Sequence, residues 1–216
     1  MAMNNDYRRT PYDSDRANYT ENKKQLEVLI RKDHPKVVDL HSQIRKNEDV
    51  YKLAFIKAYD GRCAYCGASI DFVDKVMFEV DHYIPQTDRS RFRSKKDAGY
   101  MSNLILACHD CNRSKHDYSI PDNYLDKLHP DKDYICRVFD RDEKYYIRIA
   151  DNYKEDEVIT RFYNQLRLGN EMHRLDYLLL NMIGLRCMYQ DDCHFSNLDK
   201  IIRLLIRKRN IGIPEK

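Results

Sequence analysis

The sequence lacks any run of about 18 consecutive apolar residues, which excludes a membrane-spanning helix. Residues 1–6 are polar and contain no apolar signal core. We therefore expect a protein that stays in the cytoplasm and has no membrane partner. The sequence also lacks internal repeats and low-complexity segments, and its 216 residues suit one compact domain with helical extensions or two small lobes.

An excess of charge of one sign is also missing, because the formal net charge is only +3. This balance is weak support for a nucleic-acid partner, so the local distribution of Lys and Arg carries more weight. Charged residues make up 34% of the chain and hydrophobic residues 42%. These fractions predict a well-solvated surface around a core of sufficient size.

The seven cysteines of a cytoplasmic chain predict metal ligands or free thiols rather than disulfides. Cys63 and Cys66 form one C-x-x-C pair, and Cys108 and Cys111 form another. Two such knuckles predict a closed zinc site of four thiolates, which stabilises the fold and does not activate water. The alternative is two separate redox pairs, but no thioredoxin-like strand–helix context supports it. The other cysteines are expected to be buried or free thiols: Cys136, Cys187 and Cys193.

The hydrophobic pattern divides the chain into helical ends and a mixed centre. Apolar residues recur at helical spacing within 21–60, with a break near Asn47. A short apolar run at 76–80 predicts a strand, 102–107 forms a second short apolar element, and a helix should begin at Asn112. We expect four segments: a polar mobile arm at 1–20, an N-terminal helical segment at 21–60, a core with the zinc site at 61–120, and a hairpin with C-terminal helices at 121–216.

The two ends of the chain carry further expectations. Arginines of the mobile arm could contact a phosphate backbone, although a solvated tail is the preferred interpretation: Arg8, Arg9 and Arg16. Two strands at 134–139 and 144–149 are expected to form a hairpin. Three C-terminal helices are expected at 158–168, 171–189 and 197–209. The last of them is apolar nearly all round and should be buried or docked on a partner.

A histidine-centred motif lies between the two cysteine pairs. Asp81 and His82 follow the first predicted strand, and Asn103 and Asn112 come later. Hydrolysis of a phosphodiester needs a base that works near pH 7 and a hard cation that polarises the phosphate. A neutral histidine suits the first task, and Mg²⁺, which binds few protein oxygens and keeps waters, suits the second. The motif therefore predicts phosphodiester chemistry on a zinc-bound scaffold.

The order of these elements resembles the zinc-knuckle branch of the HNH endonucleases over residues 61–117. The matching residues are Cys63-x-x-Cys66, Val80-Asp81-His82-x-x-Pro85, Asn103-Leu104 and Cys108-x-x-Cys111-Asn112-x-x-Lys115. The resemblance implies an α+β protein with a ββα-metal core, two strands and a helix around one divalent ion. This core would carry a four-cysteine zinc knuckle and be flanked by N-terminal and C-terminal helices. The activity it implies is metal-dependent cleavage or nicking of DNA.

The resemblance also implies a role for each matching residue. His82 would be the general base, and Asp81 would turn its carboxylate toward the catalytic divalent ion. Asn103 would hold the histidine loop by hydrogen bonds. Asn112 stands where the name-giving motif has a second histidine, a variant shared with the nuclease domain of RNA-guided effectors. An amide oxygen at this position favours Mg²⁺ or Mn²⁺ over softer metals.

Two further residues are candidates for the same site. His116 lies four residues after Asn112, so both would face the same way on a helix. His116 could be a further metal ligand or a phosphate contact, and the alternative is a solvated helix residue. Glu79 shares a strand face with Asp81 and is a weaker candidate. The other histidines lack such context and are not expected to be catalytic: His34, His41, His109, His129, His173 and His194.

Basic residues cluster beside the motif. They would bind phosphates without reading bases, whereas the alternative is an ordinary solvated surface. Lys115 is the strongest candidate for a contact with the scissile phosphate. The predicted nucleic-acid contacts are Arg89, Arg91, Arg93, Lys95, Lys96, Arg113 and Lys115.

Three functions remain open at this stage. The first is a DNA endonuclease or nickase that serves as an effector of restriction or phage defence. The second is a zinc-knuckle DNA-binding module without catalysis, which would have no need for Asp81, His82 and Asn112 together. The third is a subunit that docks a protein partner such as an ATPase, and it is compatible with the first. Strand choice, sequence specificity and the preference for DNA over RNA are not encoded in any motif that we identify.

Overall fold

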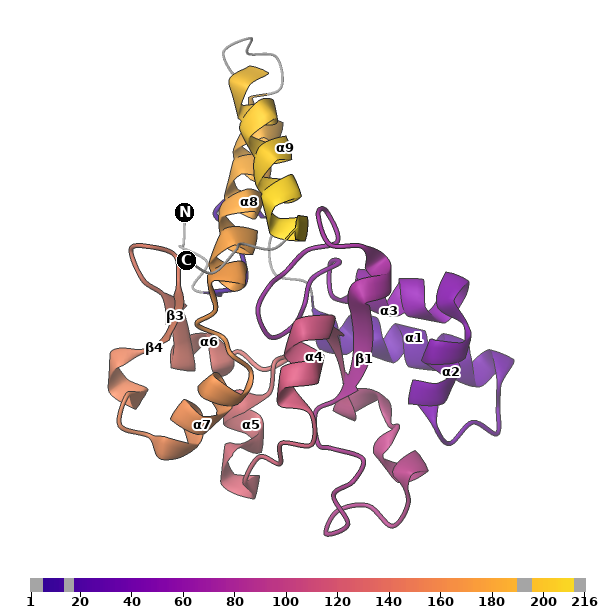
Figure 1. Ribbon diagram of the computed structural model, residues 1–216. Helices are drawn as coiled ribbons and strands as arrows, with labels where there is room; N and C mark the ends of the chain where they lie inside the picture. The colour runs from indigo at the N-terminus through magenta and orange to yellow at the C-terminus, as the bar shows by residue number, and fades with distance from the viewer. Residues whose placement is uncertain (1–5, 14–17, 190–195, 212–216) are drawn as a thin grey trace.

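A two-stranded antiparallel sheet lies at the centre of the computed structural model (Figure 1). Strand β1 (Phe78–His82) pairs with β2 (Leu104–Cys108), so that His82 lies opposite Leu104. Helix α4 (His109–Lys115) follows β2 directly. This mixed α+β arrangement confirms the predicted fold class and the two strands and helix of its core. The structure describes residues 6–13, 18–189 and 196–211.

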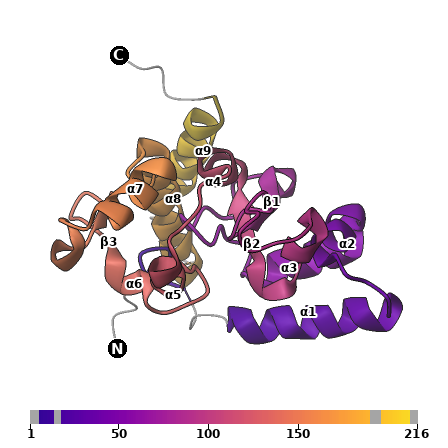
Figure 2. The same cartoon turned by 90° about the horizontal axis from the view of Figure 1, so that it is seen from below.

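The helices that precede the core lie together on one side of β1 (Figures 1 and 2). The Asn18 side chain accepts a hydrogen bond from the Glu21 amide and begins the first of them. The Asn47 side chain accepts one from the Val50 amide at 3.0 Å, so the helical run breaks where the sequence predicts. These elements are α1 (Tyr19–Asp33), α2 (Leu40–Lys46), the π-helical turn η1 (Glu48–Lys52) and α3 (Leu53–Ala58).

The C-terminal half ends in a helical hairpin, α8 and α9, that projects from the rest of the molecule (Figure 1). No helix within the described ranges is long and apolar enough to cross a membrane. The helices and strands of this half are α5 (Leu125–Leu128), α6 (Ile135–Val138), β3 (Phe139–Arg141), β4 (Ile147–Ile149), α7 (Glu157–Gln165), α8 (Glu171–Met188) and α9 (Ser196–Ile211). Short 3₁₀ turns are η2 (Lys75–Met77), η3 (Lys95–Ala98), η4 (Met101–Asn103), η5 (Asp122–Tyr124) and η6 (Asp151–Tyr153).

One expectation for this half needs correction. The strand predicted at 134–139 is wrong for most of its length, because α6 is a helical turn that buries Ile135 and Val138 on one face. The last helix, α9, was expected to be buried or docked on a partner, and within this chain it is not buried all round. Its Ile202 is buried against the molecule, whereas Leu204 is 64% exposed. Only one face of α9 therefore packs within this chain.

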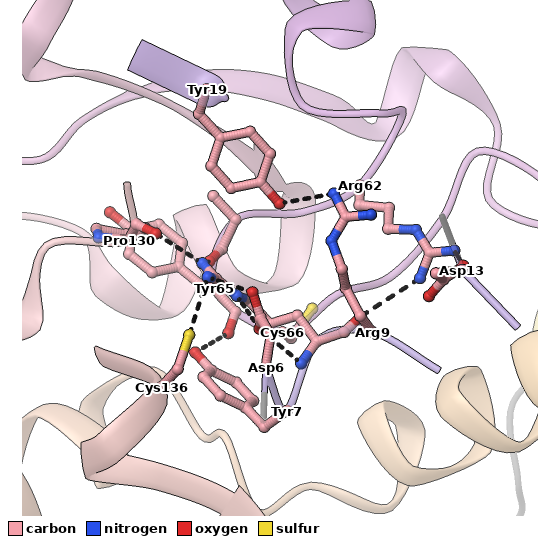
Figure 3. A network of polar contacts seen from close by, with 12 residues as sticks. Asp6, Tyr7, Arg9, Asp13, Tyr19, Arg62, Tyr65, Cys66, Pro130 and Cys136 are labelled. Carbon is pink, nitrogen blue, oxygen red and sulfur yellow. Dashed lines mark hydrogen bonds and ion pairs between the residues drawn. The ribbon is translucent and has the colours of Figure 1, made fainter. Parts of the chain in front are cut away.

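The predicted mobile arm is also wrong for residues 6–13, which pack against the first cysteine knuckle (Figure 3). The buried Arg8 guanidinium donates to the Ala64 carbonyl at 2.7 Å and to the Pro130 carbonyl at 2.8 Å. The Tyr7 hydroxyl donates to the Tyr65 carbonyl at 2.7 Å. The knuckle needs donors for these buried carbonyls, and the N-terminal segment supplies them.

The suggestion that arginines of this segment contact phosphates is wrong for Arg8 and Arg9. Arg8 forms an ion pair with Asp6 at 2.7 Å, and both side chains are buried. Arg9 is buried as well and pairs with Asp60. Neither guanidinium is available to a ligand in this arrangement. Arg16 lies outside the described residues.

Candidate active site

Four buried cysteine thiols meet between the first knuckle and the start of α4. The sulfur atoms of Cys63, Cys66, Cys108 and Cys111 all lie within 4.8 Å of one another. Those of Cys66 and Cys108 are 3.8 Å apart, and a tetrahedron with zinc–sulfur bonds of about 2.3 Å has edges of about 3.8 Å. Burial raises the pKa of the Cys66 thiol, so thiolates here need a cation beside them. The cluster therefore fits a structural metal ion.

Polar groups from distant segments surround this cluster. The Tyr65 hydroxyl donates to Asp81 Oδ2 at 2.7 Å and links the first knuckle to the histidine motif. His173 of α8 places Nε2 3.9 Å from the sulfur of Cys111. Arg141 donates to the Cys66 carbonyl at 3.4 Å. The knuckle is thus held by parts of the chain that lie on both sides of it in sequence.

A cavity of about 530 Å³ opens beside β1 and α4. It brings together Asp81, His82 and Asn112, the three residues predicted to act at one centre. The part of α2 and η1 that faces β1 forms another wall, which the sequence did not predict. The residues of this wall are His41, Arg45, Glu48 and Lys52. Other lining residues are Glu79, Pro85, Gln86, Arg113, His116 and Asp117.

His82 lies at the end of β1 and is mostly buried. Its ring centroid is 4.2 Å from that of His41, with 41° between the ring planes. Burial, with a further contribution from His41, lowers the pKa of His82 to about 3. The imidazole is therefore neutral at pH 7, which is the form that can accept a proton.

Asn103 fixes the loop that follows His82. Its amide nitrogen donates to the carbonyls of Ala98 at 2.9 Å and Ile84 at 3.1 Å. Its amide oxygen accepts from the Ile84 backbone N–H at 2.8 Å. These bonds form the loop-holding arrangement expected of Asn103, and the side chain itself is absent from the cavity lining.

Asp81 is buried against Lys115, and this corrects the role predicted for that lysine. Lys115 Nζ lies 3.1 Å from the Asp81 carboxylate and 2.7 Å from the His82 carbonyl. The lysine side chain has no exposed surface, so it cannot reach a phosphate in this arrangement. Burial raises the pKa of Asp81, while Lys115 and the Tyr65 hydroxyl oppose that shift. The lysine thus helps to keep Asp81 charged.

Glu79 and Asn112 meet at the other end of the same cavity. The Asn112 amide nitrogen donates to Glu79, whose second oxygen lies 2.7 Å from His109 Nδ1. This leaves the Asn112 amide oxygen available as a ligand for a hard cation. In the described residues, no second group of three His, Cys, Asp or Glu side chains is as closely spaced as the four cysteines.

His116 does not share a helix face with Asn112, because α4 ends at Lys115. The backbone of His116 turns into the left-handed region, with φ of 47°. Its exposed side chain still lines the cavity and lies 3.6 Å from the Asp117 carboxylate. The prediction that Asn112 and His116 face the same way on a helix is therefore wrong, although His116 lines the cavity.

The predicted basic contacts fall into two groups. Arg91 pairs with Asp88 at 3.0 Å and with Asp122 at 2.5 Å, so its positive charge is already paired with carboxylates of the protein. Arg113 lines the cavity, and its Nε donates to His109 Nε2 at 3.3 Å. The remaining side chains of the loop are exposed: Arg89, Arg93, Lys95 and Lys96.

The contribution of α2 to the cavity is not predicted from the sequence. His41 has no predicted role, because nothing in the sequence relates residue 41 to residue 82. In the structure, His41 Nε2 lies 3.0 Å from the Val80 carbonyl, so this nitrogen carries the proton of a neutral ring. The available signal was the amphipathic pattern of α2, which buries Leu40 and Ile44 and leaves the neighbouring face to the cavity.

Comparison with known proteins agrees with this geometry. The HNH endonuclease family model matches residues 63–118. The CRISPR-associated endonuclease Cas9 of Corynebacterium diphtheriae is 30% identical over 67 residues, which are 31% of this chain and 5% of that protein. The SPbeta prophage-derived protein YoqL of Bacillus subtilis, named as an HNH endonuclease, is 35% identical over 66 residues, which are 31% of this chain and 28% of that protein. No solved structure matches the chain.

These matches identify residues 63–118 as an HNH endonuclease domain and support nuclease activity in general. The chain spans far less than two thirds of either relative. The residues of α2 and η1 that line the cavity precede the matched segment.

Proposed function

We propose that this protein is a metal-dependent endonuclease that hydrolyses phosphodiester bonds of DNA, by cleavage or nicking. The observation that supports this proposal most is that Asp81, His82 and Asn112 line one open cavity. The alternative is a non-catalytic zinc-knuckle subunit that binds DNA or docks a partner. That alternative gives no reason for a neutral imidazole, a buried carboxylate and an amide to share a cavity.

His82 is the general base of the proposed reaction. It removes a proton from a water molecule as the water oxygen attacks phosphorus in line with the departing 3′ oxygen. The bond from phosphorus to the 3′ oxygen breaks, and this oxygen takes a proton from solvent, which gives a 5′-phosphate and a 3′-hydroxyl. Burial keeps the free imidazole neutral, and an anionic phosphate in the cavity favours its protonated form once the proton has been taken. The Asn103 hydrogen bonds to Ile84 keep the loop after His82 in place during this transfer.

Two metal sites belong to the proposal. Asp81 and Asn112 would hold a catalytic Mg²⁺ or Mn²⁺, with His116 at the same cavity as a further ligand or phosphate contact. Asp81 Oδ2 accepts from the Tyr65 hydroxyl and also lies 3.1 Å from Lys115 Nζ, whereas Oδ1 accepts only from Lys115 among the described residues and keeps a lone pair for an ion. When bound, such an ion polarises the phosphate and stabilises the departing oxygen. The four cysteines would hold a structural Zn²⁺.

The test is cleavage of supercoiled plasmid by purified protein in Mg²⁺ or Mn²⁺. Removing a general base costs about 10²- to 10⁴-fold in rate, so His82→Ala should lose nearly all nicking. The matched control is His34→Ala, which removes an exposed histidine that is not part of the cavity lining. Zinc content and the thermal unfolding midpoint should be unchanged in both variants. Normal nicking by His82→Ala would refute the assignment.

We further propose that the DNA it cleaves is foreign, and that the protein is a cytoplasmic effector of phage defence or restriction. The similarity to a CRISPR-associated endonuclease supports this role. A protein partner such as an ATPase subunit would supply control, and the exposed face of α9 is available for it. Phage plaque counts on cells that express wild type or His82→Ala test the role, and equal counts would contradict it.

A further inference from the structure

Helix α2 and the turn η1 bring a row of polar side chains to the cavity. His41 and Arg45 are four residues apart on α2, and Glu48 and Lys52 are four apart on η1. This spacing places each pair on one side of its helix. All four line the cavity that contains His82. They precede the segment that matches the HNH family model, so the matched domain does not supply this wall.

His41 is held against the catalytic candidate from two directions. Its Nε2–H donates to the carbonyl of Val80, which lies in β1 two residues before His82. Its ring packs beside the His82 ring, at 4.2 Å between centroids. A ring fixed at one end and in contact with a second ring restricts the rotamers open to that second ring.

Arg45 is the cation of this wall whose charge is not paired within the described part of the chain. Its side chain is exposed, and it forms no hydrogen bond or ion pair with any residue that the structure describes. The neighbouring acids are engaged elsewhere. Glu48 lies 3.7 Å from Lys52, and Asp39 accepts hydrogen bonds from Ser42.

We infer that α2 completes the active site: Arg45 binds a phosphate of the substrate strand, and His41 is a positioning residue that holds the His82 imidazole. This inference rests on the proposed nuclease function and assigns substrate recognition to a helix outside the matched domain. A guanidinium suits a phosphate because its planar N–H groups donate in pairs to two oxygens. The bound phosphate need not be the scissile one, because phosphate contacts fix the register of a strand on a protein.

The test for Arg45 is steady-state cleavage of a labelled DNA duplex by wild type and Arg45→Gln. The loss of a charge-assisted hydrogen bond should raise KM by about tenfold or more and change kcat little. Arg45→Lys should recover part of the loss, because it restores the charge without the paired donors. The matched control is Arg203→Gln, which removes an exposed arginine of α9 that is absent from the cavity lining. A wild-type KM for Arg45→Gln would overturn the phosphate assignment.

The test for His41 separates positioning from folding. His41→Ala should lower kcat with little effect on KM, whereas His41→Phe keeps a ring beside His82 and should retain more of the rate. Equal kcat in wild type and His41→Ala would overturn the positioning role. Equal losses in both variants, at an unchanged thermal midpoint, would also overturn it, because the ring contact would then have no effect.

These results separate the inference from the proposed function. Cleavage by wild type together with a normal KM for Arg45→Gln leaves the nuclease intact and removes only the role of α2. Absence of cleavage by wild type in both Mg²⁺ and Mn²⁺, at verified zinc content, together with equal plaque counts for wild type and His82→Ala in cells, overturns the nuclease and with it the inference.

Discussion

Lys115 and Asp81 form an ion pair that is shielded from solvent beside the cavity. Such pairs add little stability when compared with a well-packed apolar pair, but the removal of one partner is costly because the other charge stays buried. The pair also has a functional position. Asp81 lies next to His82 in sequence, and Lys115 contacts both the Asp81 carboxylate and the His82 carbonyl. The lysine therefore stabilises the two residues on which the proposed chemistry depends.

Lys115→Met is expected to destabilise the fold by about 3 kcal/mol or more. The matched control is Lys24→Met, at an exposed position of α1, which should change stability by less than about 0.5 kcal/mol. Urea unfolding monitored by circular dichroism measures both. An unchanged stability combined with weaker DNA binding would instead restore the phosphate contact that the sequence predicted.

The pH dependence of the same variant follows from the sign of the Asp81 shift. Burial already raises the Asp81 pKa above its ordinary value, and Lys115 opposes this. Without Lys115 the folded pKa rises further, so the folded state binds the proton more tightly than the unfolded state does. The stability deficit of Lys115→Met should therefore be small at about pH 4, where the carboxyl is protonated in the folded state, and larger at about pH 8.

At the scale of elements, the four-cysteine cluster joins the first knuckle to the end of β2 and the start of α4. A two-stranded sheet is marginally stable at best alone in water. We therefore expect the association of these elements to depend on an ion bound by the four cysteines, together with the packing of the distant segments around them. Structural zinc supplies free energy of folding directly, because the site is not preformed in the unfolded chain.

Cys108→Ser should accordingly prevent stable folding, since structural zinc binding contributes on the order of 10 kcal/mol. The matched control is Cys187→Ser, which changes an exposed thiol of α8 and should leave both zinc content and the thermal midpoint unchanged. Metal analysis of the purified proteins, with thermal unfolding before and after chelation, tests this. A zinc-free Cys108→Ser protein that unfolds like wild type would contradict the scaffold role.

The elements of the core were predictable because local signals and tertiary structure agree there. The strands β1 and β2 follow short apolar runs, and the cysteine spacing predicted the four-sulfur cluster that the structure contains. The prediction of a strand at 134–139 was wrong because a short apolar run fits one turn of a buried helix as well as it fits a strand.

The remaining parts of the site depend on contacts between distant residues. Residues 6–10 look like part of a polar tail in sequence, yet they are buried and supply donors to the knuckle carbonyls. The sequence predicts Lys115 as an exposed cation, but in the structure its side chain is buried in an ion pair with Asp81. His41 reaches His82 only through the packing of α2 on β1, and no periodicity in either segment encodes that pairing.

At the scale of the whole molecule, the positive charge is spread over several faces. The formal net charge of +3 is too small to attract DNA by itself. Exposed cations of the loop at 87–100 belong to the HNH domain, whereas α9 carries a comparable set on the projecting hairpin. The proposed function predicts that only the first set contacts DNA.

The salt dependence of DNA binding distinguishes the two sets. Replacing Arg89, Arg93 and Lys95 by Gln should weaken binding and reduce the slope of log affinity against log salt by about 0.9 for each phosphate that the protein no longer neutralises. The matched control replaces Arg203, Arg207 and Lys208, which brings the net charge from +3 to the same value of zero. Both sets are measured in the His82→Ala protein, so that the DNA stays intact. Equal slopes in the two variants would contradict the loop assignment.

The contacts of the four-cysteine cluster come from segments that are synthesised at different times. The segment at 6–13 leaves the ribosome before the four cysteines, whereas Arg141 and His173 emerge after them. A nascent chain that ends shortly after Cys111 has all four thiols but lacks the groups from the C-terminal half that surround them. The surroundings of the cluster are therefore assembled late, after the ribosome has translated well past the nuclease motif itself.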